Sequence, residues 1–152
     1  MVKKITVAAL LLCVLCGFTS VSDQLKDQLK KMPQHYEQFD LKMGWTVTSE
    51  KNDALITGVI QNVRYAFMED VEIWVSARDS QGKMVARSVD YVVPSRLDKD
   101  ELAVFTVRLP KAAAKNATLQ FTYKYAGSDG GGGDGDAIKW MQSFEATLPS
   151  GM

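Results

Sequence analysis

Residues 118–125 read Thr-Leu-Gln-Phe-Thr-Tyr-Lys-Tyr, and this stretch decides the fold class. Apolar residues occupy every second position, at Leu119, Phe121, Tyr123 and Tyr125. Successive side chains of a β-strand point to opposite faces of a sheet, so this alternation predicts a strand with one buried face and one wetter face. The β-branched and aromatic content of the stretch favours the same structure.

The same period of two continues on both sides of this strand. It recurs in residues 71–78, 85–93, 103–109 and 138–148, and shorter strands are expected at 43–48 and 55–62. In the second of these segments Val85, Val89, Tyr91 and Val93 share one face, which we expect to be buried. Regularly spaced strands without long helices predict an all-β fold, an immunoglobulin-like antiparallel β-sandwich of about seven strands.

Turn residues separate the predicted strands. Residues 79–83, Asp-Ser-Gln-Gly-Lys, form a hairpin turn in which Gly82 can adopt a positive φ. Residues 94–101 read as a charged loop, residues 112–114 as a helical turn, and residues 128–136 as a glycine-rich loop. Within the 55–62 strand, Gly58 permits a close approach or a bulge, and Asn62 is placed to bond turn backbone, so both have structural roles.

The first 22 residues have the parts of a secretory signal peptide. Lys3 and Lys4 precede a short apolar run that ends at Phe18, and small residues follow. The run is shorter than the ~20 apolar residues that a membrane span takes. We therefore expect export to the periplasm or outside the cell, with cleavage before Asp23. The alternative is a membrane-anchored lipoprotein with its lipid on Cys16, although Leu15 stands where a small residue is usual.

The rest of the chain divides into two parts. Residues 23–40 are predicted as a short helix and a linker, and residues 41–149 as one β-sandwich domain. The helix is expected over 22–32, with Ser22 as its cap, Pro33 as its stop and Leu25, Leu29 and Met32 as its apolar stripe. No apolar run after residue 22 is long enough to span a membrane.

Charge and cysteine content exclude several classes of function. The chain has 18 basic and 18 acidic side chains, and loss of Lys3 and Lys4 with the signal peptide changes the net charge from zero to −2. A chain with this charge balance lacks the excess positive charge that binding to nucleic acid needs. Both cysteines, Cys13 and Cys16, lie in the signal region, so a chain cleaved before residue 23 has no disulfide, thiol nucleophile or thiolate metal site.

Residues 55–109 resemble an FxLYD-type domain, an immunoglobulin-like module of bacterial exported and envelope proteins. The matching pieces are the Ile-Thr-Gly-Val-Ile-Gln-Asn opening at 56–62, the long strand at 71–79, the Gln-Gly-Lys turn at 81–83, the second strand at 84–93 and the segment 97–105, which ends in Ala-Val-Phe. The name-giving motif reads Val-Ser-Ala-Arg-Asp at 75–79 and keeps only the final Asp. The resemblance implies a non-catalytic extracytoplasmic module without a shared active site.

The loop at residues 127–136 is the candidate metal site. Asp129, Asp134 and Asp136 offer carboxylate oxygens, which Ca²⁺ prefers, but the spacing does not fit an EF-hand and the consecutive glycines disfavour a preformed site. The alternative interpretation is a connector between the last two strands. Ca²⁺ is the single cofactor candidate.

Trp74 is the candidate partner contact, because it falls on the face of its strand opposite to Val71 and Val75. The alternative is that it packs under the N-terminal helix or a neighbouring loop.

His35 reads as a solvated linker residue, and no nucleophile signature accompanies it. We therefore expect no enzyme. The first function hypothesis is a cell-envelope module that binds an envelope protein through strand edges, loops or Trp74. The second is a Ca²⁺- or small-ligand-binding protein that uses the 127–136 loop.

Overall fold

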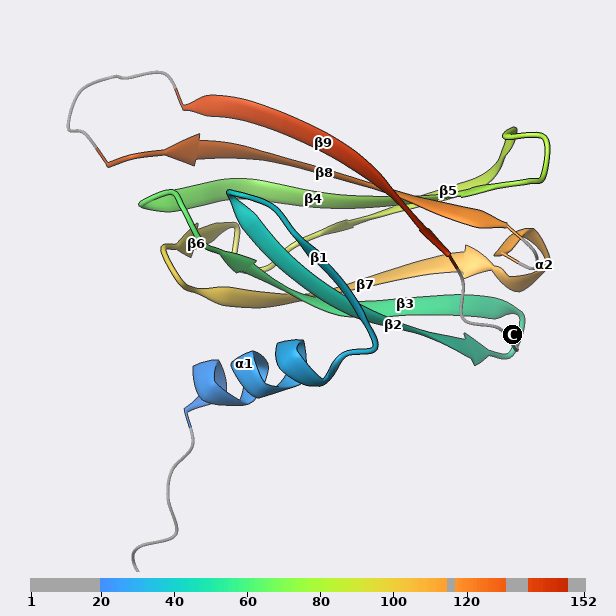
Figure 1. The fold of residues 1–152 in the computed structure, drawn as a ribbon, viewed down its shortest axis with the longest axis horizontal. Helices are drawn as coiled ribbons and strands as arrows, with labels where there is room; N and C mark the ends of the chain where they lie inside the picture. The colour runs from blue at the N-terminus through green and yellow to red at the C-terminus, as the bar shows by residue number, and fades with distance from the viewer. Residues whose placement is uncertain (1–19, 115–116, 131–136, 148–152) are drawn as a thin grey trace, which may run out of the picture.

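A computed structural model describes residues 20–114, 117–130 and 137–147 of this chain. These residues form two antiparallel sheets that face one another, with one short helix outside them (Figure 1). The prediction of an all-β sandwich is confirmed. The described residues contain nine strands where about seven were expected.

The first sheet, called sheet A below, has the strand order β1-β2-β3-β7. Its strands are β1 (Gln34–Glu37), β2 (Leu41–Glu50), β3 (Asp53–Asn62) and β7 (Leu102–Pro110). Strand β1 is short, so it pairs with only the first half of β2, from Lys42 to Trp45. It lies in the segment that the sequence indicated as a linker, because four residues are too few to show a clear period of two.

The second sheet, called sheet B, has the order β5-β4-β8-β9, with β6 paired to the start of β4. Its strands are β4 (Phe67–Arg78), β5 (Met84–Tyr91), β6 (Arg96–Asp98), β8 (Thr118–Ser128) and β9 (Ile138–Thr147). The charged loop predicted at 94–101 contains β6. The turn at 79–83 is confirmed, because Gly82 has a φ of 78° and the Asp79 carboxylate accepts the N–H groups of Gln81 and Lys83.

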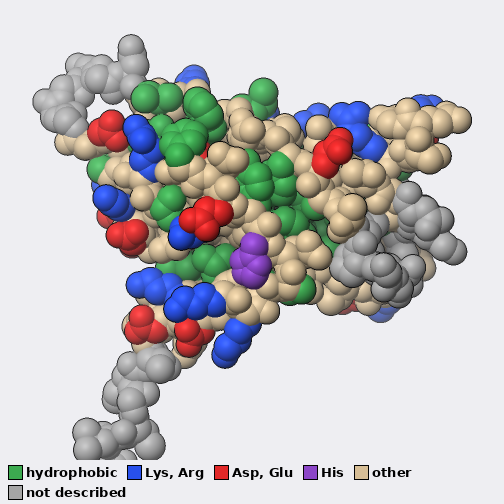
Figure 2. Space-filling view, viewed as in Figure 1, with side chains coloured by type: hydrophobic (Ala, Val, Ile, Leu, Met, Phe, Trp, Pro, Cys, Tyr) green, Lys and Arg blue, Asp and Glu red, His purple; other side chains and the backbone are tan. Residues whose placement is uncertain are grey.

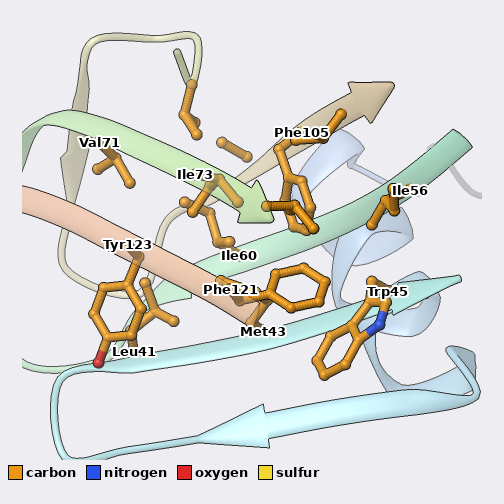
Figure 3. Close-up of a cluster of buried hydrophobic side chains, with 14 of the residues drawn as sticks. Leu41, Met43, Trp45, Ile56, Ile60, Val71, Ile73, Phe105, Phe121 and Tyr123 are labelled. Atoms are coloured by element: carbon orange, nitrogen blue, oxygen red, sulfur yellow. The ribbon is translucent and has the colours of Figure 1, made fainter. Parts of the chain in front are cut away.

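The hydrophobic core lies between the two sheets. Figure 3 shows Trp45 of β2, Phe105 of β7 and Phe121 of β8 pointing into this space. The alternating residues of β8, from Leu119 to Tyr125, are all buried. Gly58 permits the predicted close approach, because a Cβ atom there would lie 2.3 Å from the Phe105 ring.

Helix α1 (Val21–Lys31) covers part of the outer face of sheet A. Its buried residue Leu29 and its C-cap residue Met32 pack on Val59 of β3. The predicted cap was wrong by two residues. Ser20 caps the helix by accepting the N–H of Asp23 at 3.1 Å. The predicted helical turn is confirmed as α2 (Lys111–Ala114).

Asn62 has the structural role that its position predicted. Its side chain is fully buried and donates to the carbonyl oxygens of Tyr65 and Leu97. Its carbonyl oxygen accepts the N–H groups of Arg64 and Tyr65. All of its side-chain hydrogen-bonding groups are satisfied, as a buried amide requires. Asn62 therefore fixes the loop between β3 and β4.

The prediction that the face of β5 with Val85, Val89 and Tyr91 is buried was wrong. Val85 is 45% exposed and Tyr91 63% exposed, while Ser88 and Asp90 stand opposite the fully buried Val75 and Ile73. The apolar residues of β5 therefore line the outer face of sheet B, and its small and polar residues face inward. β5 is an edge strand, where burial of one face is incomplete, so the apolar positions do not identify the inner face.

Candidate protein-binding edge

The two lateral sides of the sandwich are closed in different ways. On one side Asp90 of β5 accepts the backbone N–H of Thr106 of β7 at 2.7 Å, which ties the sheets together. On the other side, between β1 and β9, aromatic rings make the contact. The rings of Tyr36 and Phe144 stack with centroids 3.7 Å apart. Within the described residues no hydrogen bond joins β1 to β9.

Strand β9 has an open edge along its whole length. It pairs with β8 from Ile138 to Thr147, and no strand of the described residues pairs with its other edge. Its inward-facing residues Trp140, Phe144 and Ala146 are only half-buried. Figure 2 shows apolar side chains along β9 and in the hollow between β9 and β1. An open edge presents unpaired N–H and C=O groups, which is a template for another strand.

Two polar atoms at this edge are buried without a hydrogen-bond partner among the described residues, the Tyr36 hydroxyl and the Trp140 indole N–H. The Tyr36 hydroxyl lies close enough to Tyr123 to contribute to a raised pKa of that phenol, but not in hydrogen-bonding geometry. An unsatisfied buried donor costs roughly 1–3 kcal/mol. Most buried polar groups in native proteins are satisfied. Both atoms belong to aromatic residues that pack between β1 and β9.

Hydrogen bonds to the buried carboxylate of Asp40 hold the turn between β1 and β2, at the end of this edge. Asp40 is fully buried and accepts hydrogen bonds from the hydroxyls of Tyr125, at 2.5 Å, and Tyr123, at 3.3 Å. Its backbone carbonyl also accepts the N–H of Val63. Burial, and then the neighbouring Asp40 carboxyl, raise the pKa of both phenols well above 10, so both hydroxyls stay protonated donors.

This turn places Phe39 on the surface next to β9. Phe39 is 51% exposed and contacts Trp140 edge-to-face, with ring centroids 5.5 Å apart. The Arg64 guanidinium lies over the other side of the Phe39 ring, at 5.4 Å from its centroid. Ile138 and Met141 of β9 are 51% and 64% exposed. The edge thus combines open backbone, half-buried aromatic rings and exposed apolar side chains. We call β1, β9 and Phe39 the β9 edge.

Trp74, the predicted partner contact, lies elsewhere, on the outer face of sheet B. Its indole N–H donates to Glu72 at 2.6 Å, and the cations of Arg87 and Lys124 lie 4.4 and 5.0 Å from its ring centroid. It is half-buried beneath these two side chains, and α1 packs on the other sheet. Its role in binding stays a prediction.

The remaining candidate residues are the predicted metal ligands, the predicted lipidation site and His35. Asp129 is exposed, whereas Asp134, Asp136 and Cys16 lie outside the described residues. No group of three or more metal-ligating side chains gathers in the part of the chain that the structure describes. His35 is exposed, as predicted, but it lies in strand β1 and not in a linker. Its Nε2 bonds the Leu29 carbonyl oxygen at 2.7 Å, which ties the end of α1 to sheet A.

Sequence reasoning did not find the β9 edge. Tyr36 and Asp40 were taken as linker residues, and Trp140 and Phe144 as ordinary positions of the last strand. The one available signal was the density of aromatic residues on that strand.

Comparisons with known proteins support the fold alone. No family model matches this chain, and no curated protein matches it. Among solved structures, the GAE domain of yeast GGA1 is similar, with a TM-score of 0.52 and 12% identity over 75% of this chain and 96% of that one. The GAE domain of GGA2p from Saccharomyces cerevisiae has a TM-score of 0.51 and 11% identity over 76% and 96%. The chain is therefore similar to immunoglobulin-like β-sandwiches. Among the described residues no helix is long and apolar enough to cross a membrane.

Proposed function

We propose that this chain is an exported, non-catalytic module of the cell envelope that binds an extended segment of a partner protein at the β9 edge. The observation that carries the proposal is the open ten-residue strand β9, with its half-buried aromatic face. In strand addition, main-chain hydrogen bonds supply affinity and the alternating side chains supply specificity.

The contacts of the β9 edge support strand addition in particular. Each new main-chain hydrogen bond contributes roughly 0.5–1.5 kcal/mol. Every second side chain of the added strand would face the space beside Trp140 and Phe144 and cover their rings.

The envelope location and the lack of catalysis rest on sequence features. The signal-peptide pattern over residues 1–22 supports export, either as a chain cleaved before Asp23 or as a lipoprotein anchored at Cys16. The resemblance of residues 55–109 to FxLYD-type domains supports a non-catalytic envelope module. His35, the single histidine, contacts a helix carbonyl, which is a structural role.

A photo-crosslinking experiment in two steps tests the proposal. A crosslinking residue at Met141, on β9, is compared with one at Val104, which is 48% exposed on the opposite sheet. We expect an envelope protein to be crosslinked from position 141 and not from position 104. Hydrogen exchange of the purified complex should then show slower exchange of the β9 amides. A complex whose β9 amides exchange as fast as those of the free chain would contradict strand addition.

A further inference from the structure

A cavity lies where α1 meets the outer face of sheet A, next to strand β1 of the β9 edge. It has a volume of about 420 Å³ and is lined by one flank of the helix and by β1, β2 and β3. Small-molecule sites in proteins have volumes of roughly 300–1,000 Å³. The cavity is therefore large enough for a small organic ligand.

One apolar wall of this cavity is held in place. Leu29 of α1 is buried and lines it, whereas the side chain of Met43, on β2, lies in the core between the two sheets. Leu29 also sits against Gly44, where an added Cβ atom would lie 2.9 Å from the leucine side chain. The bond from His35 to the Leu29 carbonyl holds the helix end against the sheet. The cavity walls thus belong to elements that are fixed to one another.

The polar part of the cavity is positively charged. Lys26 and Lys30 of α1 and Lys42 of β2 line it. Lys42 is paired with Glu37 at 2.8 Å, whereas Lys26 and Lys30 make no ion pair with any described residue. They stand four residues apart on the helix, a spacing at which like charges repel each other and destabilise the helix. An anion between them would remove this repulsion.

The helix end itself does not oppose an anion here. The carbonyl groups at the end of a helix carry partial negative charge, which normally repels anions. The Leu29 carbonyl, which faces this end of the cavity, bonds His35 Nε2 at 2.7 Å and also accepts the N–H of Met32. These bonds satisfy the carbonyl and leave the lysine ammonium groups as the dominant charges at the cavity.

We infer that this cavity binds a small amphiphilic anion, a carboxylate with a short apolar chain. Lys26 and Lys30 would hold the carboxylate, and the apolar chain would lie along Leu29. β1 lines this cavity and also belongs to the β9 edge, but β9 and Phe39 contribute no residue to the cavity, so the inference does not depend on a partner strand at β9. Figure 2 shows the lysine and arginine side chains gathered over α1 beside the histidine.

Titration of the folded chain with octanoate, followed by amide NMR, tests the inference. Acetate lacks the apolar chain and octanol lacks the charge, so both serve as ligand controls. We expect saturable shifts at Leu29, His35 and Lys42 with octanoate, and much weaker binding of either control. The double variant K26Q/K30Q should weaken octanoate binding about tenfold or more, because it removes both positive charges that would face the carboxylate.

The matched control is K31Q, which removes a charge from the same helix at a residue that does not line the cavity. It should bind octanoate as the unchanged chain does, and K26R/K30R should retain most of the affinity. No saturable octanoate binding, equal binding of acetate or octanol, or an equal loss in K31Q would overturn the inference. The amide spectra report in each case that the variant is folded.

Discussion

Replacement of Tyr125 by Phe is the sharpest test of how this structure is held together at the β9 edge. The substitution removes one hydroxyl, which donates to the fully buried Asp40 carboxyl at 2.5 Å. Asp40 then keeps a single side-chain donor, the Tyr123 hydroxyl at 3.3 Å. The turn that carries Phe39 loses its shortest polar tie to sheet B.

The expected cost follows from burial and charge. A hydrogen bond to a charged group contributes roughly 1.5–3 kcal/mol, and a buried acceptor that loses its partner is not rehydrated. We therefore expect Tyr125→Phe to lower the free energy of unfolding by about 2–3 kcal/mol. Tyr91→Phe is the matched control, since Tyr91 is 63% exposed, and it should change stability by less than about 0.5 kcal/mol.

The same substitution has a second signature at alkaline pH. Burial, and then Asp40, raise the pKa of Tyr125 above its ordinary value of 10.0. Above that pH the unfolded chain loses this phenolic proton while the folded chain keeps it. The free energy of unfolding therefore falls as pH rises, by about 1.4 kcal/mol per pH unit for this group. Tyr125→Phe removes this contribution and should flatten the alkaline slope.

Urea unfolding followed by tryptophan fluorescence measures both effects, at neutral pH and at several values above pH 10. The difference between the unchanged chain and the variant isolates Tyr125 from the other groups that titrate there. A cost below about 0.5 kcal/mol, with an unchanged alkaline slope, would refute the argument that the buried carboxyl depends on this phenol.

Three further predictions concern other parts of the chain. Gly58→Ala should destabilise the fold by about 1–3 kcal/mol in urea unfolding, because its Cβ would lie 2.3 Å from the Phe105 ring, and an unchanged midpoint would contradict this packing. A chain that begins at Asp23 lacks the Ser20 cap, so the α1 amides should exchange faster than in a longer chain, by about 1 kcal/mol in protection. Millimolar Ca²⁺ should leave the melting temperature unchanged, because Asp129 is exposed next to a run of glycines, and a clear rise would favour the Ca²⁺-binding alternative.

Sequence patterns predicted correctly those features that depend on residues close together in the chain. The alternation in residues 118–125 identified a buried strand face, and Gly82 and Asn62 were correctly assigned to their turns. These features depend on neighbours within a few residues, so strand geometry and turn chemistry determine them. The four-residue β1 and the three-residue β6 were missed because a period of two needs a longer run to show.

The sequence by itself determined a β-sandwich with its turns, its N-terminal helix and the close approach at Gly58. Only the tertiary structure decided which strands form open edges, which face of β5 points outward, and that Asp40 meets tyrosines more than 80 residues away. The physical reason is that alternation fixes which residues share a face, whereas burial of that face depends on the neighbouring strands and on the opposite sheet. The β9 edge arises from such long-range placement, because Tyr36 of β1 meets Phe144 of β9, whereas the lysine-lined cavity is built from α1 and the three strands that follow it in the chain.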